Sequence, residues 1–423
     1  MGSEAATKLC RTFVLYVIYR IFPNAIFVNI VDKLKEIASK FDVEGIPDCV
    51  TPFGSGLIND TYRVTCVPVD GVGAPCPEYV LQRINHNIFR DVELLQRNIA
   101  RITGHIRTRL AERGEGDIER KALRLVPVLG GDGAPVPAPA RKLFYFDGEA
   151  YWRMTVLISG AKTHEQLTPE LACHTGRAFG DFQGMLADLP ADPELPAEPN
   201  FPGGAPLGAT IPDFHNMEFR LGQLRDAIAG DKAGRVAEMQ GMIDEIASRA
   251  GEMCLAERMN RAGTLPKRIS HCDTKVNNVL FDERTGEVLC VIDLDTTMPG
   301  YAMADFGDFI RTAGNTGAED DRDPGRVGLD MEIFEAFARG YLETAGKFLT
   351  PTEIDLLPFG AKMLTYMQAV RFLTDYLNGD TYYKIASPDH NRVRTLAQFA
   401  HLRSLEGHEA EMKRYIETIK SQL

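Results

Sequence analysis

The chain has 423 residues, of which 44% are hydrophobic and 25% are charged, as is ordinary for a soluble globular protein. The formal net charge is −12 and the sequence pI is about 5.3, so an acidic surface argues against nucleic acid as a main partner. The length exceeds that of one ordinary core and predicts two domains, or one domain with large insertions.

The eight cysteines are scattered along the chain. They form no C-x-x-C pair and no cluster of histidines accompanies them, which argues against a zinc site. We therefore expect reduced thiols, as in a cytoplasmic protein, rather than a disulfide framework.

The N-terminal segment at residues 12–31 is rich in Phe, Val, Ile and Tyr. As a membrane span it would place Arg20, Pro23 and Asn24 near the bilayer centre, where an arginine alone costs about 2.5–3.5 kcal/mol. We therefore expect no membrane partner. Residues 1–30 are interpreted as an N-terminal extension without an assigned role, and no oligomeric state is predicted.

The next part of the chain has the pattern of a sheet with a helix packed on it. Apolar residues at helical spacing predict a helix at residues 31–41. Strands are predicted at residues 56–67 and 78–84, a helix at 91–109, and a β-hairpin at 143–158.

After Gly160 the pattern becomes mainly helical. Helices are predicted at residues 169–189, 214–229, 235–261, 331–345, 351–378 and 390–419. The Pro/Gly-rich segment 190–212 predicts a loop, and residues 279–281 and 288–294 predict two short strands joined by a turn. The fold class is therefore α+β, with a small β-rich lobe before a larger helical one.

The strongest motif is H-x-D-x-x-x-x-N, which runs from His271 to Asn278 and is followed by Asp293 in the apolar segment VIDLD. Phosphoryl transfer explains each position: Asp273 would take the proton of the attacking hydroxyl as the catalytic base. Asn278 and Asp293 would hold Mg²⁺, which bridges the phosphates of ATP. The alternative is a surface loop in which the Asp and Asn only cap turns.

This motif resembles that of the aminoglycoside phosphotransferase and choline kinase superfamily. The resemblance implies a bilobal protein-kinase-like fold, with a nucleotide-binding N-lobe at residues 31–158 and a catalytic, substrate-binding C-lobe at residues 159–423. The segment GYAMAD ending at Asp305 resembles the G-D-P-x-x-D element of that superfamily, with Tyr301-Ala302 in place of Asp-Pro. Asp305 is then expected to brace the catalytic loop.

Four segments are similar to the N-acetylhexosamine 1-kinase group. They are YVLQRINHNIF (79–89), HCDTKVNNVLF (271–281), IDLDTTMPG (292–300) and ADFGDFIRT (304–312). The resemblance implies transfer of the γ-phosphate of ATP to the anomeric hydroxyl of N-acetylglucosamine or N-acetylgalactosamine, a small-molecule sugar partner.

The first nucleotide-binding candidates lie in the segment that leads into the second predicted strand. Gly54, Ser55 and Gly56 would let the backbone approach phosphates, with Asn59 close by. A plain hairpin turn is the alternative. The chain has no G-x-x-x-x-G-K-[ST], which disfavours a Walker-type NTPase.

The strand that follows lacks the lysine that contacts phosphates in protein kinases. Gln82 stands in that place, with Arg83 next to it, so either Arg83 or another cation is expected to meet the phosphates. Glu93 on the following helix is a candidate partner. Lys275, two residues after the base, is expected either to approach the γ-phosphate or to lie in solvent.

The acceptor side is expected to use buried polar groups, because a wrong substrate leaves them unpaired. Arg371 and Tyr382 are the candidates, since their spacing from Asp273 resembles that of the sugar-contacting Arg and Tyr of N-acetylhexosamine 1-kinases. A salt bridge on a helix face is the alternative for Arg371. Asp295 is expected either to contact metal or sugar, or to cap a turn.

Three functions remain open at this point. The first is an N-acetylhexosamine 1-kinase. The second is a kinase of the same fold that acts on another alcohol or amino sugar, such as choline, homoserine or an aminoglycoside. The third is a catalytically inactive kinase fold that serves as a binding module, which the absence of the strand lysine keeps open.

Overall fold

The computed structural model describes residues 25–54, 58–69, 76–137, 140–164, 167–189 and 207–423. The chain divides into two compact units. The first comprises residues up to Ala100 together with Leu123–Ser159, and the second comprises Arg101–Ala122 together with Gly160–Leu423. The predicted extension and loop fall largely outside the described residues, as do Ser55 and Gly56.

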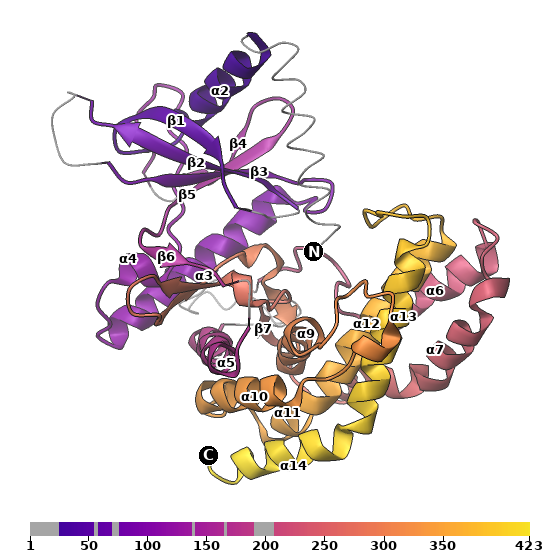
Figure 1. The fold of residues 1–423 in the computed structure, drawn as a ribbon. Coiled ribbons are helices and arrows are strands. Elements are labelled where there is room, and N and C mark those ends of the chain that lie inside the picture. The colour runs from indigo at the N-terminus through magenta and orange to yellow at the C-terminus, as the bar shows by residue number, and fades with distance from the viewer. Residues whose placement is uncertain (1–24, 55–57, 70–75, 138–139, 165–166, 190–206) are drawn as a thin grey trace. The chain divides into compact units, whose positions relative to one another are not determined.

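The first unit is built on a five-stranded antiparallel sheet in the order β1-β2-β3-β5-β4 (Figure 1). The strands are β1 (Ile46–Pro52), β2 (Asp60–Val67), β3 (Tyr79–Ile84), β4 (Tyr145–Phe146) and β5 (Tyr151–Val156). Strand β3 alternates buried and more exposed positions, as a strand with one buried face requires, whereas the middle four residues of β5 are all buried.

One face of this sheet packs against helix α2 (Ala25–Ala38). Leu34 from the helix joins a buried cluster with Val64, Leu81 and Met154, which come from three neighbouring strands. Because strand side chains alternate between faces, this packing leaves Gln82 and its cross-strand neighbour on the opposite face.

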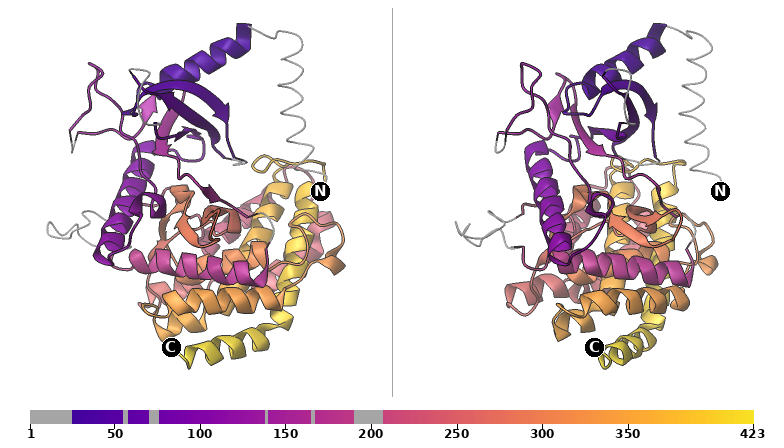
Figure 2. Two further views of the ribbon diagram at one scale, coloured as in Figure 1. Left: turned by 60° about the vertical axis from the view of Figure 1, so that its left-hand side comes forward. Right: turned by 90° about the vertical axis from the view of Figure 1, so that its left-hand side faces the viewer.

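The second unit is mainly helical. Its helices after Gly160 are α5 (Pro169–Met185), α6 (Met217–Gly230), α7 (Gln240–Met253), α8 (Leu255–Arg261), α9 (Ala302–Ala313), α10 (Met331–Ala345), α11 (Pro351–Asp355), α12 (Leu357–Leu377), α13 (His390–Gly407) and α14 (Glu409–Lys420). Helix α10 lies between α5 and α14 (Figure 2). Helix α12 is buried along nearly its whole length and packs against α6, α9 and α13.

Short strands hold the catalytic segment within this unit. They form one pair, β7 (Arg268–Ser270) with β10 (Met298–Gly300), and one three-stranded sheet, β6 (Ala161–Lys162), β8 (Val279–Asp282) and β9 (Val288–Val291). The H-x-D-x-x-x-x-N motif therefore begins at the end of one strand and runs directly into another.

Helices α9 and α12 approach each other so closely that only glycine fits at their crossing. A Cβ atom added to Gly307 would lie 2.2 Å from the carbonyl oxygen of Gly360, far inside van der Waals contact. Both partners at this contact are backbone, so a side chain can be accommodated only by moving one helix.

We expect Gly307→Ala to lower the free energy of unfolding by roughly 1–3 kcal/mol, because overpacking forces the backbone to shift. The matched control is Gly241→Ala on α7, where an added Cβ meets nothing within 4 Å. There the better helix propensity of alanine should leave stability unchanged or raise it by up to about 1 kcal/mol. Urea unfolding of both variants tests this, and equal behaviour would contradict the packing argument.

The α+β, two-lobe fold class is confirmed, whereas several element boundaries differ from the predictions. Strand β1 and helix α9 were not predicted. Three predicted helices are each broken in two, at Cys254, at Leu356 before the proline of α12, and at His408. Proline is accepted in the first turn of a helix but interrupts its interior, which explains the second break.

None of the helices in the described ranges has the length and hydropathy needed to cross a membrane.

Candidate active site

The catalytic loop follows β7 and carries His271, Asp273 and Asn278. Its last three residues form a single 3₁₀ turn, Val276–Asn278, and the chain then enters β8. The backbone N–H of Ile292 donates to the carbonyl of Asn278 at 2.9 Å, which brings the segment after β9 alongside the loop. This hydrogen bond fixes the residue before Asp293 at Asn278, and the metal-ligand role of Asn278 and Asp293 stays a prediction.

The carboxylate of Asp305 on α9 binds the backbone of the catalytic loop. Its carboxylate accepts the backbone N–H of His271 at 2.7 Å and that of Cys272 at 2.8 Å, and it also accepts Nε2 of Gln183 at 2.7 Å. The hydroxyl of Thr274 donates to the carbonyl of Asp305 at 2.6 Å. The expected brace is therefore present, even though Tyr301-Ala302 replaces Asp-Pro before it.

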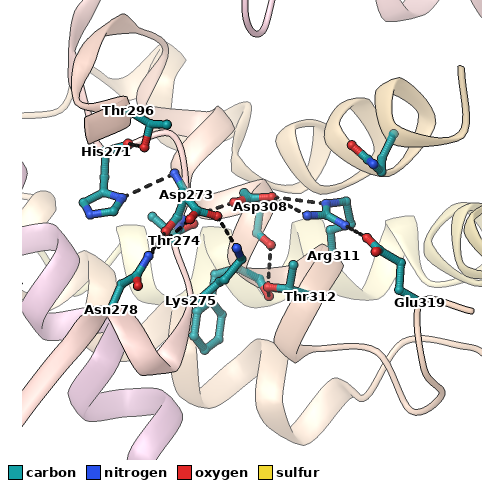
Figure 3. Close-up of polar contacts among 12 residues, drawn as sticks. His271, Asp273, Thr274, Lys275, Asn278, Thr296, Asp308, Arg311, Thr312 and Glu319 are labelled. Carbon is teal, nitrogen blue, oxygen red and sulfur yellow. Dashed lines mark hydrogen bonds and ion pairs between the residues drawn. The ribbon is translucent and has the colours of Figure 1, made fainter. Parts of the chain in front are cut away.

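Asp308, one helical turn further along α9, gives the loop a second support (Figure 3). It accepts the backbone N–H of Thr274 at 3.1 Å. Its other oxygen accepts Nη2 of Arg311 at 2.9 Å, and Arg311 reaches Glu319 at 2.7 Å. Asp308 and Arg311 were not among the predicted site residues, although polar residues that recur every three positions in an otherwise apolar segment are a usable signal.

The backbone at the site is strained at two non-glycine residues. Cys272 (φ 63°) and Asp293 (φ 60°) both have the left-handed conformation. Such conformations are rare outside glycine and cluster at functional sites, where the surrounding hydrogen bonds impose them.

Asp273 is held in place by both neighbours in the motif. Nδ2 of Asn278 donates to the backbone carbonyl of Asp273 at 2.8 Å. The backbone N–H of Asp273 donates to Nδ1 of His271 at 3.3 Å. The opposite ring nitrogen of His271 lies 2.9 Å from the carbonyl of Ile292, so it is the protonated nitrogen. These contacts fit His271 as an orienting residue rather than a proton carrier.

The Asp273 carboxylate faces the ammonium group of Lys275, with 2.6 Å between Oδ1 and Nζ. Burial alone would raise the pKa of Asp273, but the positive charge of Lys275 and its hydrogen bond outweigh burial and hold the pKa below its ordinary value. The carboxylate is therefore ionised at neutral pH, the form that can accept a proton. Lys275 is about 42% exposed, and its expected approach to the γ-phosphate stays a prediction.

A pocket opens at Asp273 within the second unit and holds about 80 Å³, room for several water molecules. Its lining comes from four parts of the chain: Phe214 and His215, Cys272 and Asp273, Asp308 and Arg311, and the α12 residues Leu364, Met367, Gln368 and Arg371. The structure thus brings the predicted base and the predicted acceptor arginine to one pocket.

Aromatic rings and a glutamine fix the guanidinium of Arg371. It lies 5.3 Å from the ring centre of Phe214 and 5.7 Å from that of Tyr383, and Nη1 donates to Gln368 at 3.1 Å. Asp375 accepts the backbone N–H of Tyr383 at 3.0 Å and so positions that ring. His215, Gln368 and Tyr383 were not predicted as site residues, because nothing in their local sequence marks them.

The other two acceptor candidates do not line this pocket. The side chain of Tyr382 is 64% exposed, and its backbone N–H donates to Asp375 at 2.8 Å. Asp295 is buried, and its carbonyl accepts the hydroxyl of Thr210 at 2.8 Å. Contact of either side chain with substrate stays a prediction.

The residues proposed for Mg²⁺ offer the hard oxygen ligands that this ion prefers. Nδ2 of Asn278 donates to Asp273, so its amide oxygen is the atom that would meet a cation, and Asp293, an exposed residue, would supply a carboxylate. Across the described ranges, no group of three His, Cys, Asp or Glu side chains could hold a metal by itself. One amide and one carboxylate suit an ion that keeps several waters and binds phosphate oxygens.

The nucleotide-side candidates lie on the sheet of the first unit. Gly54 has a left-handed backbone (φ 73°), and Asn59 accepts the backbone N–H of Asn85 at 2.9 Å. Arg83 is about half exposed and forms an ion pair with Asp60 at 3.4 Å. Gln82 instead accepts Nε of the buried Arg153 at 2.8 Å from the neighbouring strand. Arg153 is a cation that the sequence analysis missed.

Comparison with known proteins agrees with this geometry. Residues 50–351 match the family model described as "Phosphotransferase enzyme family". The fold is similar to that of an aminoglycoside phosphotransferase from Alicyclobacillus acidocaldarius (TM-score 0.52, 14% identity, 90% of this chain and 96% of that one). It is also similar to an ethanolamine kinase from Plasmodium vivax (TM-score 0.50, 14% identity, 82% and 81%). The chain belongs to the APH phosphotransferase family.

Proposed function

We propose that the protein transfers the γ-phosphate of ATP to the anomeric hydroxyl of an N-acetylhexosamine. The observation that carries this proposal is the shared pocket of Asp273 and Arg371, which puts a proton acceptor beside a rigid hydrogen-bond donor. The four segments that resemble N-acetylhexosamine 1-kinases support the choice of sugar.

In this reaction Asp273 takes the proton of the acceptor hydroxyl while the hydroxyl oxygen forms its bond to the γ-phosphorus. The bond between that phosphorus and the bridging oxygen breaks, and ADP leaves. Asn278 and Asp293 would hold Mg²⁺, which offsets the phosphate charge when bound. Asp305 and Asp308 act only through the backbone of the loop, as positioning residues.

Arg153 would supply the cation that the chain lacks at the strand-lysine position. It is the cross-strand partner of Gln82 and contacts it through Nε. Arg83 is the weaker candidate, because it already pairs with Asp60 and extends toward solvent. In this arrangement Gln82 orients a guanidinium toward the phosphates instead of contributing a charge of its own.

The pocket disfavours the cationic acceptors among the alternatives. A choline, ethanolamine or aminoglycoside site needs net negative charge around the bound amine. In the part of the chain that the structure describes, Arg371 forms no ion pair, so its charge would repel such a substrate. Neutral polyhydroxy acceptors fit this environment better.

The test is ADP release with Mg²⁺-ATP across N-acetylglucosamine, N-acetylgalactosamine, glucose, homoserine, choline and kanamycin, with the phosphorylated position assigned by ³¹P NMR. We expect turnover with the N-acetylhexosamines and a phosphate on the anomeric oxygen. Turnover with choline or kanamycin alone would overturn the sugar assignment. A lack of turnover with every acceptor, despite ATP binding, would favour the binding-module interpretation.

A further inference from the structure

Two arginines near the catalytic pocket form no ion pair in the described ranges: Arg371 lines the pocket, and Arg220 binds the backbone of Phe214, which also lines it. Asp213 acts on Arg220 only beyond ion-pair distance. Arg371 donates to Gln368, and Arg220 on α6 donates to Gln223 at 2.9 Å and to the carbonyl of Phe214 at 3.0 Å. Two neutral hydrogen-bonding partners do not compensate a partly buried guanidinium.

The two guanidinium groups flank a single residue. Arg220 binds the carbonyl of Phe214, whereas Arg371 lies 5.3 Å from the centre of the Phe214 ring. Burial, and then the charge of Arg371, lower the pKa of Arg220 to about 10. The two positive charges repel each other, and an anion bound close to both would relieve that repulsion.

The remaining charges of the pocket are already neutralised. Asp273 pairs with Lys275, and Arg311 pairs with Asp308 and Glu319. His215 lines the same pocket, and burial together with Arg371 and Arg220 lowers its pKa to about 3, so it is a neutral imidazole. Its buried Nδ1 has no hydrogen-bond partner within the described part of the chain. The uncompensated charge beside the base is thus positive.

We propose that Arg220 and Arg371 bind an anionic substituent of the acceptor, so that the substrate is an acidic N-acetylhexosamine carrying a carboxylate, sulfate or phosphate. This inference rests on the proposed function, because it places the acidic group relative to the hydroxyl that faces Asp273. Paired guanidinium groups are well suited to such oxyanions, which accept two hydrogen bonds from each fork. The neutral His215 offers one further hydrogen bond to the same ligand.

The experiment compares N-acetylglucosamine with N-acetylmuramic acid, N-acetylglucosamine 6-sulfate and N-acetylglucosamine 6-phosphate, which all keep a free anomeric hydroxyl. We expect at least one acidic sugar to have a KM about tenfold or more below that of N-acetylglucosamine. One charge-assisted contact supplies a gain in affinity of that size. The three acids distinguish which oxyanion the site prefers. Calorimetric binding without ATP should show the same order.

The variants are Arg220→Gln and Arg220→Lys, with Arg225→Gln as the control on the exposed side of the same helix. Arg220→Gln should raise the KM of the preferred acid about tenfold and leave that of N-acetylglucosamine unchanged, whereas Arg220→Lys should restore part of the difference. Arg225→Gln should change neither.

Two results would overturn the anionic-acceptor proposal while leaving the sugar kinase intact. One is equal or better use of the neutral sugar, with Arg220→Gln without effect on any acid. The other is a raised KM for ATP in Arg220→Gln at an unchanged acceptor KM, which would assign the arginines to the nucleotide phosphates. Absence of anomeric phosphorylation with all four sugars would instead refute the proposed function itself.

Discussion

Asp273→Asn should lower kcat by about 10²–10⁴-fold, the usual contribution of a positioned general base. The amide has the shape of the carboxylate but cannot take the proton of the acceptor hydroxyl. The folded structure should persist, because the side chain of Asp273 is partly exposed and its ion pair with the half-exposed Lys275 contributes little. Initial rates at saturating acceptor, with the melting temperature of both proteins, give the measurement.

Retained binding of Mg²⁺-ATP in Asp273→Asn separates a lost base from a lost nucleotide site. A kcat within about threefold of the parent, well outside the range for a general base, would show that proton transfer occurs elsewhere. Asp308 would then be the next carboxylate to consider, because it lines the same pocket.

Asp305→Asn should lower the free energy of unfolding by roughly 2–4 kcal/mol and abolish most of the activity. The three groups around the carboxylate, the N–H groups of His271 and Cys272 and the amide of Gln183, are all donors. An asparagine has one accepting and one donating end, so at least one buried donor loses its partner and faces another N–H.

The control for this substitution is Asp226→Asn, at an exposed position of α6. It should change stability by no more than about 0.5 kcal/mol, as surface substitutions usually do. Chemical unfolding followed by circular dichroism measures both variants. A stable and fully active Asp305→Asn protein would show that the loop does not depend on this brace.

The elements that could be predicted are those whose own sequence period matches their environment. Three sequence patterns predict an element with one buried face: the alternating residues of β2, the hairpin of β4 and β5, and the apolar face of α5. Helix α9 was missed because almost all of its residues are buried, apolar and charged alike, so that no polar face marks a helical period. Strand β1 was missed because it is largely exposed and carries two prolines, so that no alternation of apolar residues marks it.

The site residues likewise divide into those that a local sequence pattern marks and those that it does not. The predicted base Asp273 and the predicted metal ligand Asn278 belong to one local motif, so their spacing in the sequence was enough to predict them. His215, Tyr383 and Arg153 act through neighbours that are distant in sequence, and the contacts that select them exist only after the helices and strands have packed. A single sequence carries no pattern that reveals such pairs.

The glycine contact between α9 and α12 has a consequence for changing the specificity of this protein. Because Gly307 meets the backbone of Gly360, the helix that braces the base and the helix that bears Arg371 behave as one rigid block. An altered side chain at Gln368 or Arg371 should therefore change which acceptor is chosen without misaligning the catalytic loop. Redesign of the acceptor pocket can proceed along α12 while the chemical step is left as it stands.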